Sequence, residues 1–147
     1  MILRFTISLH RIGPGLNRHT AAGVPITDHL DWFFETTPDQ ANSLKTFASP
    51  IEDFESPVIA TTQLFDHRVT YLDYDGDVSG NRGSVQRLVT GTYQFVASNT
   101  NRFAIGPIAI EKAVASDSQV DQEPDVHQIR ETLFRLLTQH ETIELTF

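Results

Sequence analysis

Strict alternation of apolar and polar residues at the N-terminus constrains the fold more than any other feature. In residues 2–10, "ILRFTISLH", apolar side chains occupy the odd positions from Leu3 to Leu9, and polar ones occupy the even positions from Arg4 to His10. A period of two residues is that of a strand with one buried face. We therefore expect a strand over residues 2–10 that ends with His10 on its polar face.

Short segments rich in β-branched and aromatic residues, separated by turn residues, continue this pattern. We expect strands over residues 29–35, 44–50, 58–67 and 84–97. The strand that ends at His67 is expected to continue with Val69 and Tyr71 on the same face. Residues 79–83, "SGNRG", indicate a hairpin connection, and Gly91 a bulge or second turn. Many short strands with little helix predict a mainly β fold, a small closed or partly open β-barrel.

The C-terminal third differs in composition and in periodicity. Residues 111–125 are acidic and polar, which predicts a linker. Over residues 126–139 the apolar positions recur at helical spacing, and Asp125 is placed to cap the N-terminus of this amphipathic helix. A closing strand is expected over residues 142–147. We predict one domain spanning residues 1–147, in which the acidic C-terminal segment can contact a partner protein.

Composition excludes several classes of function. The chain has no cysteine, which excludes disulfides, thiolate catalysis and cysteine-ligated metals. Its net charge of −8 argues against broad, sequence-independent binding to nucleic acid. No apolar run approaches the ~20 residues of a membrane span. We expect a cytoplasmic protein without membrane contact.

Three of the six histidines stand at strand ends on polar faces: His10, His29 and His67. Asp31 shares a strand face with His29, so the group supplies two histidines and a carboxylate plus a spare histidine. Such a set suits Mn²⁺, Zn²⁺ or Fe²⁺ with open positions for water or substrate. Each histidine by itself is also typical of an edge residue satisfied by hydrogen bonds. His19, in a Gly- and Pro-rich loop, could take the place of His10.

Several segments, in order, resemble the 3′-phosphoesterase domain of bacterial DNA ligase D, including its standalone versions. These segments are "FTISLH", "HLDWFFE", "LKTFASP", "DHRVTYLDYDGDVSGNRGSV" and "GTYQF". Together they cover roughly residues 4–95, and their order and spacing are more specific than any one of them.

The resemblance implies a compact β-barrel with a Mn²⁺-preferring site at His10, His29 and Asp31, where Zn²⁺ is also possible. It also implies phosphate-contacting or acid/base roles for His67 and Tyr71. In that family the domain trims 3′ ends of DNA, removing a terminal phosphate or ribonucleotide. A 3′ end of nucleic acid, bound weakly, and a repair ligase are therefore the expected partners.

The chain departs from the family pattern at cationic positions. Family arginine or lysine residues correspond here to Phe33, Ile59 and Ile51, and a family His-Tyr pair corresponds to Asn81–Arg82. Arg68 and Arg82 could contact phosphate instead, since arginine forks onto phosphate well. We therefore expect reduced activity. The alternatives are a non-catalytic relative that binds metal or nucleic-acid ends, and a structural β-domain whose acidic helix docks a partner.

Overall fold

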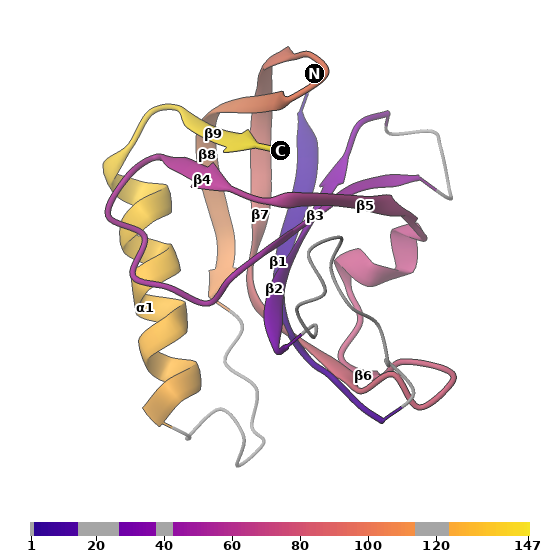
Figure 1. Cartoon of the computed structure of the whole chain (residues 1–147). Coiled ribbons are helices and arrows are strands. Elements are labelled where there is room, and N and C mark those ends of the chain that lie inside the picture. Colours follow the sequence, from indigo (N-terminus) through magenta and orange to yellow (C-terminus); the bar gives the residue numbers. More distant parts are fainter. Residues whose placement is uncertain (1, 15–26, 38–42, 114–123) are drawn as a thin grey trace.

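A computed structural model describes residues 2–14, 27–37, 43–113 and 124–147, and most of these residues form strands (Figure 1). The elements are β1 (Leu3–Arg11), β2 (His29–Glu35), β3 (Leu44–Ser49), β4 (Val58–Ala60), β5 (Thr62–His67), the 3₁₀ helix η1 (Val69–Leu72), β6 (Gly76–Asp77), β7 (Ser84–Ser98), β8 (Arg102–Ala113), α1 (Pro124–Gln139) and β9 (Ile143–Thr146).

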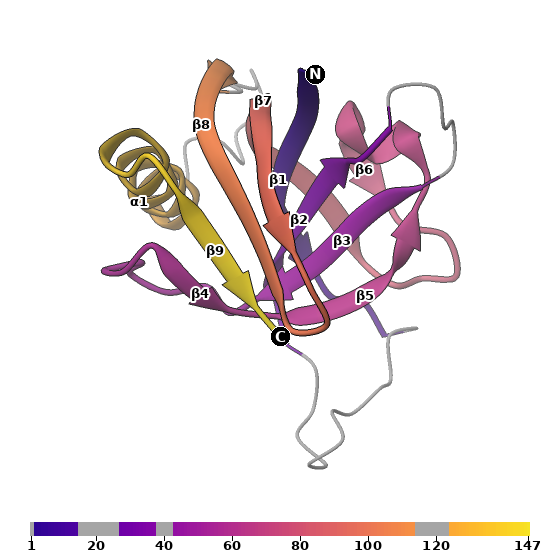
Figure 2. The same cartoon turned by 90° about the horizontal axis from the view of Figure 1, so that it is seen from above.

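A single curled sheet contains all of these strands (Figure 2). Its order is β4-β9-β8-β7-β1-β2-β3-β5, with β6 paired to β7. The strands at the two ends of this order are neighbours in the chain, since only Thr61 separates β4 from β5. The Thr61 amide donates to the Thr146 carbonyl at 2.8 Å, which ties this junction to β9. The prediction of a partly open barrel with one C-terminal helix is confirmed.

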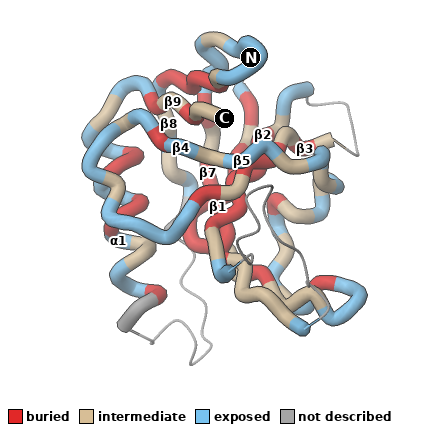
Figure 3. Tube along the Cα trace, in the orientation of Figure 1, coloured by how far each residue is buried: buried red, intermediate tan, exposed pale blue. Residues whose placement is uncertain are grey.

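The main core fills the inner side of the sheet. Alternate residues of β1 and β2, among them Ile7, Trp32 and Phe34, are fully buried there (Figure 3). Helix α1 packs against β7 and β8 and adds these side chains to the same core: Val126, Leu133, Leu136 and Leu137. The predicted amphipathic face is therefore the one that packs on the sheet.

The opposite face of β1 and β2 carries polar side chains and is partly covered by η1. Phe33, Leu44 and Leu72 form a small second cluster there. The Thr6 hydroxyl donates to the Leu72 carbonyl at 2.8 Å, which fixes η1 on this face. A polar strip of the sheet is thus shielded from water without becoming part of the main core.

The structure corrects four expected details. The segment 58–67 forms two strands rather than one, because β4 pairs with β9 and β5 with β3. The continuation through Val69 and Tyr71 is the helix η1, not a strand. Helix α1 begins at Pro124, so Asp125 lies within it rather than before it. The predicted linker overlaps β8 at residues 111–113, and residues 114–123 lie outside the described part.

Two turn predictions are confirmed. Residues 79–83 connect β6 to β7, and Gly80, Asn81 and Gly83 all have positive φ there. The register of β7 against β8 shifts between Thr90 and Gly91, as a bulge requires. Among the described helices, none is both long and apolar enough to cross a membrane.

Candidate metal centre

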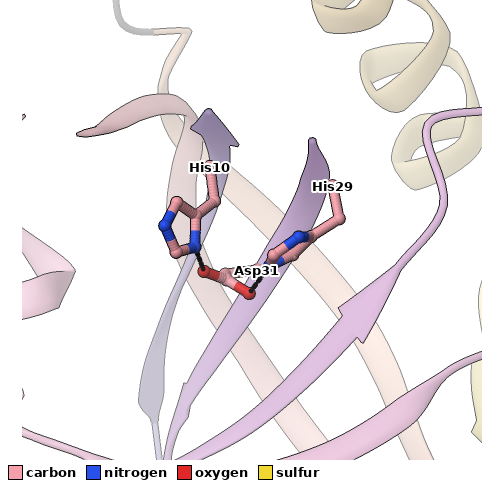
Figure 4. Close-up of side chains that lie close together, drawn as sticks. All are labelled: His10, His29 and Asp31. Carbon is pink, nitrogen blue, oxygen red and sulfur yellow. Dashed lines mark hydrogen bonds and ion pairs between the residues drawn. The ribbon is translucent and has the colours of Figure 1, made fainter. Parts of the chain in front are cut away.

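The pairing of β1 with β2 brings three possible metal ligands together (Figure 4). His10 lies directly opposite His29, and Asp31 is two residues further along the same face of β2. One ligand atom from each of these residues lies within 4.8 Å of the other two. The predicted set of two histidines and a carboxylate is therefore assembled by strand register alone.

The Asp31 carboxylate lies between the two imidazoles. Its Oδ2 is 3.1 Å from His10 Nδ1, and its Oδ1 is 3.0 Å from His29 Nε2. Asp31 is only 3% exposed. The His29 ring is at ion-pair distance from Oδ1, and Oδ1 has no partner beyond this contact. A buried carboxylate needs a positive charge beside it, and its unsatisfied oxygen needs a hydrogen-bond donor or a cation.

Backbone carbonyls hold the outer nitrogen of each ring. His10 Nε2 lies 3.0 Å from the Arg82 carbonyl, and His29 Nδ1 lies 2.8 Å from the Thr27 carbonyl. A carbonyl only accepts, so these outer nitrogens carry hydrogen. The inner nitrogens, His10 Nδ1 and His29 Nε2, face Asp31: a protonated ring donates to the carboxylate, and a neutral ring offers a lone pair to a cation. Metal-binding histidines are typically oriented in this way by a carbonyl on the other nitrogen.

Gly83 allows the turn after β6 to deliver the Arg82 carbonyl to His10. Its φ is +100°, and a Cβ at this position would lie 1.8 Å from the Arg11 carbonyl oxygen. No other residue type fits so close an approach at positive φ. The glycine-rich connection between β6 and β7 thus orients the His10 ring through the Arg82 carbonyl.

The carboxylate and the histidines shift each other's ionisation. Burial lowers the pKa of the His29 imidazole, but the contact with Asp31 outweighs burial, and the net pKa is raised. Burial raises the pKa of the Asp31 carboxyl, but the hydrogen bond from His10 and the contact with His29 outweigh it, and the net pKa is lowered. Both shifts favour a positive charge beside Asp31. A proton or a divalent cation can provide that charge.

These shifts predict how the stability of the metal-free protein depends on pH. A raised pKa for His29 contributes stability that is fully present below the ordinary value of ~6.5 and is lost as the pH rises through the folded value. The Asp31 contribution is lost only as the pH falls through its own lowered pKa. We expect the unfolding temperature in EDTA to fall from pH 6 to pH 8.5 by more in the wild type than in His29→Gln. Equal pH dependence of the two proteins would contradict this coupling.

His67 and Tyr71 are not among the three candidate ligands, and both pack on Phe33 of the same strand face. Phe33, two residues after Asp31 on the same face of β2, contacts both: its ring centroid lies 5.4 Å from that of His67 and 5.5 Å from that of Tyr71. A register shift in the β3–β5 pairing lets His67 reach this face. Such bulges commonly re-aim a side chain next to a functional site.

The two arginines proposed as phosphate contacts differ in their surroundings. Arg68 is exposed next to His67, and no ion pair or side-chain hydrogen bond involves it among the described residues. The Arg82 guanidinium donates to the Ser79 carbonyl and hydroxyl, at 2.7 and 3.1 Å. Arg68 is therefore the freer of the two cations. His19, the alternative to His10, lies outside the described residues.

Sequence reasoning missed four contributors to the site. The carbonyls of Thr27 and Arg82 carry no signal in the side-chain pattern. Ser8 reads as an ordinary polar position of an alternating strand, yet it is fully buried opposite Asp31. Phe65, in the irregular part of β5, is 90% exposed, and its carbonyl is 2.7 Å from His67 Nδ1.

Comparison with known proteins adds no family assignment. No family model matches the sequence, and no curated protein matches it. The resemblance to the 3′-phosphoesterase domain of DNA ligase D therefore stays a prediction that depends on the residues quoted above.

Proposed function

We propose that this protein is a metal-dependent phosphoesterase that removes phosphate from 3′ ends of nucleic acid. One observation carries the proposal: His10, His29 and Asp31 converge while carbonyls hold the outer nitrogen of each ring. This arrangement leaves two imidazole nitrogens and a carboxylate oxygen within 4.8 Å of one another. It is the donor set of a site for a borderline divalent cation.

The residues present fit Mn²⁺, which we propose as the resident metal, and they also fit Zn²⁺. When bound, such a cation polarises a phosphoryl oxygen and lowers the pKa of a coordinated water. The donors would be two nitrogens and one carboxylate oxygen, so coordination positions would remain for water and for substrate. The described residues bring no further histidine, aspartate or glutamate into this group.

In this proposal, His67 moves the proton. Its Nδ1 faces the Phe65 carbonyl at 2.7 Å and therefore carries hydrogen, so Nε2 is the atom free to exchange a proton. Hydrolysis forms a bond from water oxygen to phosphorus and breaks the bond from phosphorus to O3′. Protonated Nε2 would donate to the departing O3′, giving a 3′-hydroxyl and inorganic phosphate. Tyr71, stacked on Phe33, would help to orient the phosphate.

Few cationic side chains are available to contact the phosphate of the substrate. Phe33 is buried under His67 and Tyr71, and Ile59 lies in the main core, so neither position can present a cation. Ile51 is exposed but apolar. Each missing oxyanion donor costs about 3 kcal/mol of transition-state stabilisation, roughly a hundredfold in rate. Arg68, which has no side-chain partner among the described residues, is the cation left to contact the phosphate, so we expect slow turnover.

The direct test is release of phosphate from a labelled 3′-phosphate primer-template, with Mn²⁺, Zn²⁺, Mg²⁺ or EDTA. A 5′-phosphate duplex of the same sequence is the matched substrate control. We expect slow release from the 3′ end with Mn²⁺ and none in EDTA. Equal release from both ends, or full activity in EDTA, would contradict the proposal.

The exposed ring of Phe65 supports a nucleic-acid end as the substrate. A base stacked on an aromatic side chain contributes about 1–3 kcal/mol. We therefore expect Phe65→Ala to weaken binding of the primer-template by roughly 5- to 100-fold and to leave hydrolysis of a small phosphate ester unchanged. Phe95→Ala removes a ring that is 52% exposed but packs on Phe103 instead, and it serves as the control.

The salt dependence of binding gives an independent check on the same prediction. A protein of net charge −8 displaces few counterions, so binding should neutralise on the order of one to three phosphates. Tight binding to internal duplex with a steep salt dependence would contradict recognition of an end.

A non-catalytic metal-binding relative is the second candidate, and the burial of Phe33 favours it. The phosphate-facing side of the site carries an aromatic side chain where the resembled family has a cation. Such a protein would bind Mn²⁺ and a 3′ end but release no phosphate. If the protein binds metal but releases no phosphate with Mn²⁺, Zn²⁺ or Mg²⁺, that result would support the non-catalytic candidate.

A further inference from the structure

Ser8 is a buried polar residue with no hydrogen-bond partner, directly beside the candidate metal centre. It is fully buried, and its Oγ and Asp31 Oδ1 are the two buried side-chain atoms left unsatisfied among the described residues. Ser8 and Asp31 are also cross-strand partners in the β1–β2 register. Two unsatisfied oxygens therefore stand opposite one another on the same face of the sheet.

Other buried hydroxyls of these strands are satisfied. Thr6 donates to the Leu72 carbonyl at 2.8 Å, Thr46 to the Leu44 carbonyl at 2.9 Å, and Ser49 to the Pro50 carbonyl at 3.3 Å. An unsatisfied buried hydroxyl destabilises a fold, so its presence needs an explanation. The unsatisfied hydroxyl of Ser8 lies next to His10 and His29 on the polar face of β1 and β2, so we look for its explanation in the candidate metal centre.

We infer that Ser8 is a positioning residue for the metal centre: its hydroxyl donates to the Asp31 oxygen that does not bind the cation. This inference deepens the proposed function and rests on it. Directly opposed residues of an antiparallel pair have Cβ atoms about 4.5–5.5 Å apart, so rotation about the Ser8 Cα–Cβ bond can bring Oγ to the carboxylate. Carboxylate ligands are commonly held by such a hydrogen bond, which sets which oxygen faces the metal.

The inferred contact would satisfy Ser8 Oγ and Asp31 Oδ1 together. The carboxylate is turned with one oxygen toward each imidazole, at 3.1 and 3.0 Å. A cation held by both rings and by one Asp31 oxygen would leave the second oxygen free to accept a hydrogen bond. The Ser8 hydroxyl is the nearest buried donor in the strand register.

The test compares Ser8→Ala with the matched control Thr46→Val, which removes a buried hydroxyl that already has a partner. Mn²⁺ affinity is measured by calorimetry and by electron paramagnetic resonance, and the unfolding temperature is measured in EDTA. We expect Ser8→Ala to bind Mn²⁺ about 10- to 100-fold more weakly, with an unfolding temperature in EDTA that is not lowered. Thr46→Val should show the reverse: unchanged affinity and a lower unfolding temperature.

The outcomes separate this inference from the proposed function. Wild-type affinity in Ser8→Ala would overturn the role of Ser8 and leave the metal centre intact. Ser8→Cys, which keeps a weak donor, should bind with intermediate affinity, so the test does not depend on one variant. A wild-type protein that binds neither Mn²⁺ nor Zn²⁺ would overturn both proposals. Weak binding by Ser8→Ala, with no phosphatase activity in the wild type, would support the role of Ser8 and contradict only the reaction.

Discussion

Asp31→Asn should abolish the stabilisation of the protein by Mn²⁺. Asparagine keeps the shape of the side chain but removes the negative charge that lies between the two imidazoles. We expect the affinity to fall by more than ~100-fold, because loss of a ligand exceeds the 10- to 100-fold typical of a ligand's supporting partner. In the wild type, Mn²⁺ at 100 times its Kd adds about 2.7 kcal/mol, which raises the unfolding temperature by about 8 °C.

The control for this substitution is Asp73→Asn. Asp73 is an exposed residue that pairs with Arg4 at 2.7 Å, so its removal tests the loss of one charge elsewhere on the molecule. Exposed pairs contribute little, and we expect the Mn²⁺ response of this variant to match that of the wild type. A full thermal response in Asp31→Asn would show that the cation binds elsewhere. An NMR spectrum of the backbone amides of metal-free Asp31→Asn would establish that this variant is folded.

His67→Ala should have the second largest effect, and on catalysis alone. Loss of a general acid typically lowers a rate by about 10²- to 10⁴-fold. His67 is not among the candidate ligands, so its removal should leave Mn²⁺ affinity unchanged. We expect phosphate release from the 3′-phosphate primer-template to fall below detection in a single-turnover assay, with an unaltered thermal shift by Mn²⁺.

Two further variants guard against a purely structural effect. His67→Gln keeps a side chain over Phe33 and should be equally inactive, because glutamine cannot transfer a proton. His127→Ala removes an exposed histidine of α1 that pairs with Glu131 at 3.2 Å, and this variant should retain full activity. Turnover that survives both substitutions of His67 would contradict the assigned role.

The first two strands show how much of the site the sequence pattern can predict. Period-two alternation places His10, His29 and Asp31 on polar faces, and antiparallel pairing makes His10 and His29 neighbours. Side-chain chemistry and strand period are both local properties, which is why these residues could be identified. The same reasoning found the apolar face of α1 and the bulge at Gly91.

Long-range pairing determines what the pattern missed. Strand β8 was not predicted, since Gly106 and Pro107 interrupt it, and they fall where its register against β7 is irregular. The division of residues 58–67 into β4 and β5 at Thr61 depends on β9, more than 80 residues away, as the Thr61–Thr146 hydrogen bond shows. The burial of Ser8 and the carbonyls that orient the histidines likewise depend on segments distant in sequence. No local pattern encodes them.

The place of β9 in the sheet has a consequence for protein synthesis. This strand pairs with β4 on one side and with β8 on the other, so it joins segments made long before it leaves the ribosome. Until then, β4 and β8 each present unpaired backbone groups, which are templates for pairing with another chain. Completion of the sheet is therefore a late event. A nonsense codon only a few residues before β9 should yield an aggregating polypeptide rather than a slightly shorter folded one.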